Sequence, residues 1–298
     1  MKQSTKLLRA FLLKLSLRFF SLLPLRVAHA LGALIGGWAA LSSNKLRRIT
    51  RINVDLCFPE WDERDRARLV RRSLVETGKT FTETGALWLW NERRVLSLVT
   101  QISGEHLVKH ALAQGRGMIL AVPHLGAWEA VGLYCSAHYP ITSLYRPPRM
   151  GELDGMIRHA RQRLGATLVP TDAGGVRALY KALEKGEMMG VLPDQEPGAG
   201  NGIFAPFFGM PAYTMVLLSR LAMKTKAAVV FAYAERLPRG AGYHLHFLPA
   251  PQAINDGPLE DSVRCVNSVT EECVRALPEQ YQWSYKRFRT RPEGESAY

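Results

Sequence analysis

The chain has 298 residues, of which 47% are hydrophobic and 9% aromatic, and this is ample material for the core of an α/β domain. Its four cysteines, Cys57, Cys135, Cys265 and Cys273, include no CxxC pair, which argues against a thiolate zinc site and for reduced, mostly buried thiols in a cytosol-facing protein. The formal net charge of +13 predicts a polyanionic partner: nucleic acid, anionic lipid headgroups, or a phosphorylated or acidic substrate.

The basic residues are concentrated at the two ends of the chain. Residues 1–54 contain ten Lys or Arg and no Asp or Glu, and a second basic run, KRFRTR, covers residues 286–291. Between these segments the charges are close to balanced. The two ends are therefore the parts of the chain that we expect to meet the anionic partner.

The N-terminal segment predicts a helix that lies in a membrane surface. Residues 7–23 are rich in Leu and Phe, and the basic residues among and before them fall on one half of a helical wheel: Lys2, Lys6, Arg9, Lys14 and Arg18. Pro24 then breaks the helix. A second apolar stretch, Val27 to Leu41, is shorter than the ~20 residues that span a bilayer unaided.

Three interpretations of this segment compete. The basic start and the triplet Ala28-His29-Ala30 suggest a secretory signal peptide, but Lys14 and Arg18 interrupt the apolar core that such a peptide needs. The segment could also be a soluble helix pair packed on the domain. We favour a retained anchor, interfacial or inserted as one span, over residues 1–45, followed by a single domain over residues 46–298. The flanking basic residues predict that this domain lies on the cytoplasmic side.

Beyond about residue 100, apolar runs of strand length alternate with helical patterns. This alternation predicts an α/β fold with a mixed, largely parallel sheet flanked by helices. The expected strands are 117–123, 142–145, 166–171, 187–192, 227–236 and 243–249; the expected helices are 125–137, 151–164, 176–184, 211–224 and 259–277. A Gly- and Pro-rich loop is expected over 193–202.

Polar residues with catalytic potential follow the first of these strands. His124 comes directly after it, and Glu129 lies five residues further on. Ligands bind beyond the carboxyl ends of the strands in α/β sheets, so His124 lies where an active site is expected. If Gly126 forms a turn before the helix, Glu129 can orient one ring nitrogen while the other accepts a proton. A helix N-terminus also favours the neutral imidazole.

Several blocks of this chain resemble one enzyme family. The sequence HLGAWE, residues 124–129, matches the HX4(D/E) block of the glycerolipid-type acyltransferases, and its surroundings resemble the late acyltransferases of lipid A biosynthesis, of the lauroyl/myristoyl type. The resemblance covers nearly the whole chain. Its other blocks are RINVDLCFPE at 51–60, Glu83, YRP at 145–147, DQ at 194–195, FAPFFG at 204–209, Thr214, WSYKRF at 283–288 and RP at 291–292.

The resemblance implies transfer of a fatty acyl chain from an acyl carrier protein thioester to a hydroxyl of a lipid A precursor. It implies His124 as general base with Glu129 as its partner, no further cofactor, and an inner-membrane enzyme that contacts anionic lipids and no nucleic acid. A positioned base speeds attack by a lipid alcohol by roughly 10²–10⁴-fold. No G-x-S-x-G motif provides a covalent nucleophile, so direct transfer is expected.

Further residues are candidates for binding substrate. Arg146 is a candidate for an oxyanion donor or for a phosphate clamp. Asp194 and Gln195 are expected to line the site at the same sheet edge. Tyr145, Lys286 and Arg287 are further candidates, whereas Arg158, Arg161 and Arg163 fit a solvated helix face better.

Two other sequence features are expected to have no catalytic role. The segment 204–209 is interpreted as a packed aromatic loop. His244 and His246 alternate along a strand, but no third ligand at a suitable sequence spacing accompanies them, so we expect no metal site.

Two alternative functions stay open. The chain could acylate another lipid alcohol, such as a phosphatidylinositol mannoside, a lysophospholipid or an amino-acid lipid. It could also be a non-catalytic, basic protein that binds membranes or nucleic acid, in which case replacing His124 would change nothing.

Overall fold

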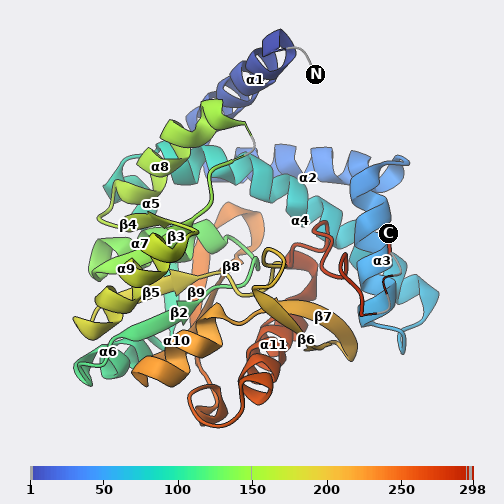
Figure 1. The fold of residues 1–298 in the computed structure, drawn as a ribbon. Helices are drawn as coiled ribbons and strands as arrows, with labels where there is room; N and C mark the ends of the chain where they lie inside the picture. The colour runs from blue at the N-terminus through green and yellow to red at the C-terminus, as the bar shows by residue number, and fades with distance from the viewer. Residues whose placement is uncertain (1–2, 149, 293, 295–296) are drawn as a thin grey trace.

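A seven-stranded sheet forms the centre of the molecule, with helices on both faces (Figure 1). The computed structural model describes residues 3–148, 150–292, 294 and 297–298, as well as the side chains of these residues apart from Gln3, Ser4 and Lys6. Lys2 and the Lys6 side chain of the predicted basic face thus lie outside the described residues. The strands follow the order β1-β9-β8-β2-β5-β3-β4, and every neighbouring pair is parallel except β8 and β9. The predicted mixed, largely parallel sheet is confirmed.

The central strands are short and fully buried. All four residues of β2 and of β5 are buried, as expected for parallel strands covered on both faces. The strands of the sheet are β1 (Val99–Ser103), β2 (Met118–Ala121), β3 (Ile141–Tyr145), β4 (Thr167–Pro170), β5 (Met188–Val191), β8 (Ala228–Arg236) and β9 (Tyr243–Pro249). The short strand β1, on the edge beside β9, is absent from the sequence-based prediction because four of its five residues are exposed and give no buried pattern.

The helices enclose two cores, one on each face of the sheet. On one face α6 (Glu105–Ala113) and α7 (Trp128–His138) pack on the sheet; on the other lie α9 (Ala173–Glu184), α10 (Leu217–Thr225) and α11 (Leu259–Ala276). The remaining helices are α1 (Gln3–Leu22), α2 (Leu25–Leu41), α3 (Lys45–Cys57), α4 (Glu63–Leu89), α5 (Glu92–Leu96) and α8 (Asp154–Gln162), with short 3₁₀ turns at 151–153, 238–240, 252–254 and 278–280.

One predicted helix is partly wrong. Residues 211–224 divide into strand β7 (Met210–Met215) and helix α10, and β7 pairs with β6 (Gly202–Phe207) in a separate antiparallel hairpin. The aromatic segment predicted as a loop is therefore mostly strand, with its turn at Phe208 and Gly209. Phe207 and Phe208 are nevertheless buried, and the Phe208 ring packs edge-on against Phe58 and Trp283. These tertiary contacts select the hairpin over the local helical pattern.

The two N-terminal helices differ in how they meet the body. Helix α2 lies along the long helix α4, and Gly78 allows a close approach, since a Cβ there would lie 2.0 Å from the carbonyl oxygen of Gly32. Helix α1 extends outward from the body (Figure 1). Both helices expose large apolar side chains. On α1 these are Leu7, Leu8, Phe11, Leu12, Leu15, Phe19 and Leu22, and on α2 they are Val27, Leu34, Ile35, Trp38 and Leu41.

Neither of these helices alone has the length and hydropathy of a bilayer span, and the same holds for every other helix in the described part of the chain. Helices α2 and α3 pass that test together, but they bend by 78° at the break between them.

Candidate active site

The residues between β2 and α7 form a tight turn that carries His124. Gly126 has φ +61°, and a Cβ at this position would lie 1.9 Å from the carbonyl oxygen of Ala234, so the turn requires glycine. The turn is held from two sides: the Ala127 N–H donates to the Ala234 carbonyl at 2.8 Å and the Gly126 N–H to the Gln280 carbonyl at 3.0 Å. As predicted, His124 precedes the helix and Glu129 lies in its first turn.

Asp194, which follows β5, holds His124 at two points. The His124 ring Nδ1 lies 2.9 Å from Asp194 Oδ1, and the His124 backbone N–H donates to Oδ2, also at 2.9 Å. The Asp194 side chain is almost fully buried. Burial alone would raise the pKa of this carboxyl, but the charge of His124 and the hydrogen bonds from it keep the pKa below its ordinary value. Because an ionised carboxylate only accepts hydrogen bonds, Nδ1 is the ring nitrogen that donates to Asp194.

The second ring nitrogen of His124 faces an amide. Gln195 Nε2 lies 3.2 Å from His124 Nε2 and donates to Gln282 Oε1 at 3.1 Å. The Gln282 backbone N–H in turn donates to the His124 carbonyl at 3.0 Å. The sequence predicted a site-lining role for Gln195, but Gln282 was missed because only the fold brings the segment after α11 next to the turn.

The predicted contact between Glu129 and His124 is wrong in this structure. Glu129 instead forms a two-point ion pair with Arg161 of α8: Arg161 Nε donates to Glu129 Oε2 at 3.1 Å, and Nη2 donates to Oε1. The charge of Glu129 raises the pKa of Arg161. Nδ1 of His124 is already occupied by Asp194, so the carboxylate that orients the ring comes from the neighbouring strand instead of from the HX4E block.

Arg161 was expected on a solvated helix face, and it lies instead at the site, half-buried. Its guanidinium carbon is 5.8 Å from the centre of the Tyr145 ring, and that of Arg158 is 5.4 Å from the same ring. The helical pattern of α8 placed these arginines on the polar side, but it could not show that Glu129 of α7 faces them.

His124 and Glu129 line one cavity of about 410 Å³ together. Its wall is mostly apolar and includes residues of α1 and α4; the lining residues are Leu13, Leu17, Thr80, Phe81, Glu83, Thr84, Leu87, Trp88, Ala127, Trp128, Leu153, Ile157, Arg161 and Gln282. A second, narrower apolar cavity of about 90 Å³ shares Trp128, Glu129 and Arg161 with it and runs between α7 and the sheet, past Gly132 and Ile141. The Glu129–Arg161 pair thus lies at the boundary of the two cavities.

Two of the predicted substrate contacts lie at the end of β3. Tyr145 is buried, and its hydroxyl donates to Asp154 Oδ1 at 2.8 Å, which together with burial raises the pKa of Tyr145 to about 12. The tyrosine therefore fixes the start of α8, and its ring lies beside the two arginines of that helix. Arg146 is exposed at the carboxyl end of the same strand.

Arg287 does not lie where a substrate can reach it. Its side chain is buried and donates to the Tyr213 carbonyl at 2.8 Å and to Thr214 Oγ1 at 2.7 Å. This placement contradicts the predicted substrate contact, since the guanidinium holds the C-terminal segment onto the β6–β7 hairpin. Lys286 is half-buried, and its ammonium lies 4.8 Å from the centre of the Tyr298 ring.

Glu83 of α4 is part of a buried ionic network beside the site. Its carboxylate accepts from Arg236 Nε at 2.8 Å and from the Tyr243 hydroxyl at 3.0 Å, and His29 Nε2 of α2 lies 2.9 Å away. Burial opposes ionisation, but Arg236 lowers the pKa of Glu83 to about 2. The network therefore ties α2, α4 and β8 together behind the turn that carries His124.

The structure also supplies a third polar neighbour for His244 and His246. Glu235 is nine residues before His244, on the adjacent strand β8. A carboxylate oxygen of Glu235 lies within 4.8 Å of a ring nitrogen of each histidine. The sequence analysis considered only ligands at a suitable sequence spacing, and antiparallel pairing of β8 with β9 brings in a carboxylate whose spacing fits no short motif.

Comparisons with known proteins identify the family of this chain. A family model described as bacterial lipid A biosynthesis acyltransferase matches residues 2–290. The chain is 32% identical over 273 residues to a lipid A biosynthesis lauroyltransferase of Escherichia coli K12, covering 91% of this chain and 88% of that protein. It is 30% identical to a lipid A biosynthesis acyltransferase of Haemophilus influenzae, covering 94% and 88%. A lipid A biosynthesis myristoyltransferase of Escherichia coli K12 is 23% identical, covering 92% and 85%. The chain belongs to the bacterial lipid A biosynthesis acyltransferase family.

Proposed function

We propose that this enzyme transfers a fatty acyl chain of the lauroyl/myristoyl class from an acyl carrier protein thioester to a hydroxyl of a lipid A precursor. His124 is the general base, Asp194 orients it, and the transfer is direct. The observation that carries this proposal is the hydrogen bond between His124 Nδ1 and Asp194, since in the neutral ring it leaves the lone pair on Nε2, beside the Gln195 amide.

The chemistry follows from that geometry. The acceptor hydroxyl displaces the Gln195 amide from His124 Nε2 and gives its proton to that nitrogen as the oxygen attacks the thioester carbonyl. The imidazolium that forms is stabilised by the Asp194 carboxylate at 2.9 Å. The carbonyl then re-forms, the C–S bond breaks, and the departing thiolate takes the proton from His124.

Cysteine nucleophiles fit the protein poorly. Burial raises the pKa of the Cys135 and Cys273 thiols to about 12, and that of Cys57 well above its ordinary value. A buried thiol that stays protonated is a weak nucleophile. These directions support direct transfer without an acyl-enzyme.

The lipid substrates fit the shape and charge of the site. The narrow apolar cavity between α7 and the sheet suits an acyl chain, since its walls are mostly hydrocarbon. Arg161, at the boundary of the two cavities, and the exposed Arg146 are the cations that we assign to the oxyanion or to a phosphate of the acceptor.

The same proposal accounts for the N-terminal helices. Leu13 and Leu17 of α1 line the larger cavity, while Leu12 and Leu15 on the same helix are exposed. The cavity that holds His124 thus lies beside a helix that also exposes apolar side chains. We propose that residues 1–45 anchor the enzyme on the cytoplasmic side of the inner membrane, where the basic residues contact anionic lipids and the body meets the acyl carrier protein.

A lipid assay tests this function. Membranes containing the enzyme are incubated with acyl carrier protein thioesters of increasing chain length and with a tetra-acylated lipid A precursor. The masses of the extracted lipids are then measured by mass spectrometry. We expect a gain of one acyl group, largest with lauroyl or myristoyl donors. A gain only on a phospholipid or glycolipid acceptor contradicts the assigned acceptor, and a gain only with coenzyme A thioesters contradicts the assigned donor.

A further inference from the structure

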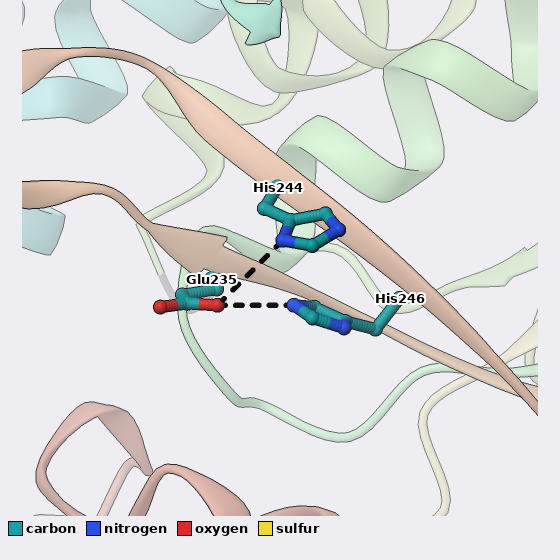
Figure 2. Close-up of side chains that lie close together, drawn as sticks. All are labelled: Glu235, His244 and His246. Carbon is teal, nitrogen blue, oxygen red and sulfur yellow. Dashed lines mark hydrogen bonds and ion pairs between the residues drawn. The ribbon is translucent and has the colours of Figure 1, made fainter. Parts of the chain in front are cut away.

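The pairing of β8 and β9 gathers two imidazoles and a carboxylate on one face of the sheet. Glu235 lies directly opposite His244, and His246 is two residues further along the same strand, so all three side chains point to the same side. Figure 2 shows one carboxylate oxygen of Glu235 facing both rings. All three side chains are half-buried, and Glu235 Oε2 is the shared neighbour.

The distances among the three groups approach those of a metal site. Glu235 Oε2 lies 3.0 Å from His246 Nε2 and 3.9 Å from His244 Nδ1, and all three ligand atoms lie within 4.8 Å of one another. Ligands about 2.0–2.2 Å from a tetrahedral Zn²⁺ are about 3.4 Å apart, a value between the two measured distances. Small side-chain movements would therefore bring the carboxylate oxygen to this separation from both ring nitrogens.

Neighbouring residues hold both rings in orientations that suit a ligand. His244 Nε2, the nitrogen that faces away from Glu235, lies 2.8 Å from the Ser103 hydroxyl of β1. A metal-bound histidine usually donates its other N–H to such an oxygen, which fixes the tautomer. The His246 ring stacks on Tyr233, with ring centres 4.6 Å apart and planes 16° apart, so its orientation is fixed too.

We propose that Glu235, His244 and His246 form a site for a divalent transition metal, with Zn²⁺ as the ion that fits best. Two imidazole nitrogens and one carboxylate oxygen are ligands that Zn²⁺ prefers, and partial exposure leaves room for a water as fourth ligand. The ion takes the place of the proton that His246 Nε2 donates to Glu235. This assignment replaces the sequence-based expectation that the chain has no metal site.

The position of the site points to a structural role. Ala234, the residue before Glu235, accepts the hydrogen bond from the Ala127 N–H in the turn that carries His124. Arg236, the residue after it, holds the buried Glu83. A metal that clamps β8 to β9 at this point stabilises the backbone to which the catalytic turn is attached, while it takes no part in the acyl transfer.

Zinc binding to the purified full chain tests the proposal. The protein carries an affinity tag without histidine, is freed of metal with a chelator, and is then titrated with Zn²⁺ alone; bound zinc is counted by mass spectrometry after gel filtration. We expect one zinc per chain and a rise in melting temperature of about 5 °C at 100-fold excess over the dissociation constant. Co²⁺ in place of zinc should give visible absorption bands of nitrogen and oxygen ligation.

Matched variants identify the ligands. Glu235→Gln and His246→Ala should each weaken zinc binding at least about 100-fold, and Ser103→Ala, which keeps all three ligands, about 10–100-fold. His106→Ala, which removes an exposed histidine from α6, and Cys265→Ser, which removes the half-buried thiol, should bind zinc as the unaltered chain does. The proposal is overturned if zinc binding is unchanged in Glu235→Gln, His246→Ala and Ser103→Ala. It is also overturned if the unaltered chain binds no stoichiometric zinc.

Discussion

His124 and Asp194 are joined by two hydrogen bonds, each 2.9 Å long. One links the His124 ring Nδ1 to one carboxylate oxygen, and the other links the His124 backbone N–H to the second oxygen. Each residue lies three positions after the end of one of two neighbouring parallel strands, β2 and β5, so the sheet helps to set their separation. Glu129, the acidic residue of the HX4E block, forms an ion pair with Arg161. On the proposed mechanism, Asp194 therefore orients the base and Glu129 positions a cation.

This division predicts different kinetic effects for two isosteric variants. Asp194→Asn removes the carboxylate that fixes the tautomer of His124, and we expect kcat to fall by about 10²–10⁴-fold. Glu129→Gln leaves the base oriented but frees Arg161, so we expect a smaller loss of kcat and a larger rise in KM for the lipid acceptor. Steady-state kinetics on both variants checks this. The reverse order of effects on kcat would restore Glu129 as the partner of His124.

The buried network around Glu83 predicts a pH-dependent stability. The folded-state pKa of about 2 lies below the ordinary value of 4.5, so the ionised carboxylate stabilises the fold above about pH 5, and this contribution is lost as the pH falls towards 2. The shift corresponds to about 3 kcal/mol. Unfolding by denaturant between pH 7 and pH 3 should show the loss, and Glu83→Gln should be less stable at pH 7 and flatter with pH. Equal slopes for both proteins would contradict the assignment.

Arg287 predicts a loss of stability in place of a loss of substrate affinity. Its hydrogen bonds to Tyr213 and Thr214 are buried, so Arg287→Ala leaves both oxygens without this donor and should lower the free energy of unfolding by about 2 kcal/mol or more. Lys286→Ala, at the half-buried neighbouring position, is the matched control and should cost less. If Arg287→Ala instead raised KM for the lipid with unchanged stability, the buried role would be wrong.

Gly132 predicts a change of acyl-chain preference. It lines the narrow apolar cavity, and a Cβ at this position would meet no atom within 4 Å, so a larger side chain can enter the cavity from α7. We expect Gly132→Leu to shift the preferred donor to shorter acyl chains, whereas Gly132→Ala should change it little. Competition between donors of different length, read by lipid mass spectrometry, measures the shift. An unchanged preference in Gly132→Leu would place the acyl chain elsewhere.

The exposed apolar face of α1 predicts binding to lipid surfaces. Phe11, Leu15 and Phe19 are each more than half exposed. Changing all three to Ser removes apolar area and leaves the buried Leu17 in place, although the Phe19 ring also gives up its edge-on contact with Phe20. We expect vesicle binding to fall by at least tenfold. Flotation with vesicles of anionic and neutral lipid measures the effect. Unchanged flotation would show that another surface carries the membrane contact.

The sequence predicted the parts of the fold that rest on local patterns. Strands β2 and β5 are buried apolar runs, which a sequence pattern reveals. His124 comes soon after β2, and Gly126, at a positive φ, marks the turn that follows it. The residues that meet His124 come from positions 194, 195 and 282, which only the sheet order and the segment after α11 bring together. Asp194 and Gln195 were predicted to line the site from their place after a strand at the same sheet edge, and the resemblance includes them too, but their particular contacts required the fold.

Errors arose where tertiary contacts override local signals. The segment 211–224 was predicted as one helix, yet its first five residues pair as a strand with β6. The hairpin that results buries Phe207 and Phe208, and Phe208 packs against Phe58 and Trp283. Arg287 looked like one member of an exposed basic run, and the same hairpin buries it. The pairing of Glu129 with Arg161 depends on the approach of α7 and α8, which no spacing within either helix shows.

The most direct test of the account is the rate of acyl transfer by the purified enzyme and by its His124→Ala variant, with a lauroyl acyl carrier protein thioester and a tetra-acylated lipid A precursor. Folding of the variant is checked by its melting temperature. The account predicts a loss of at least about 10²-fold in kcat with an unchanged fold. Full activity in the variant would contradict His124 as the base and the mechanism with it.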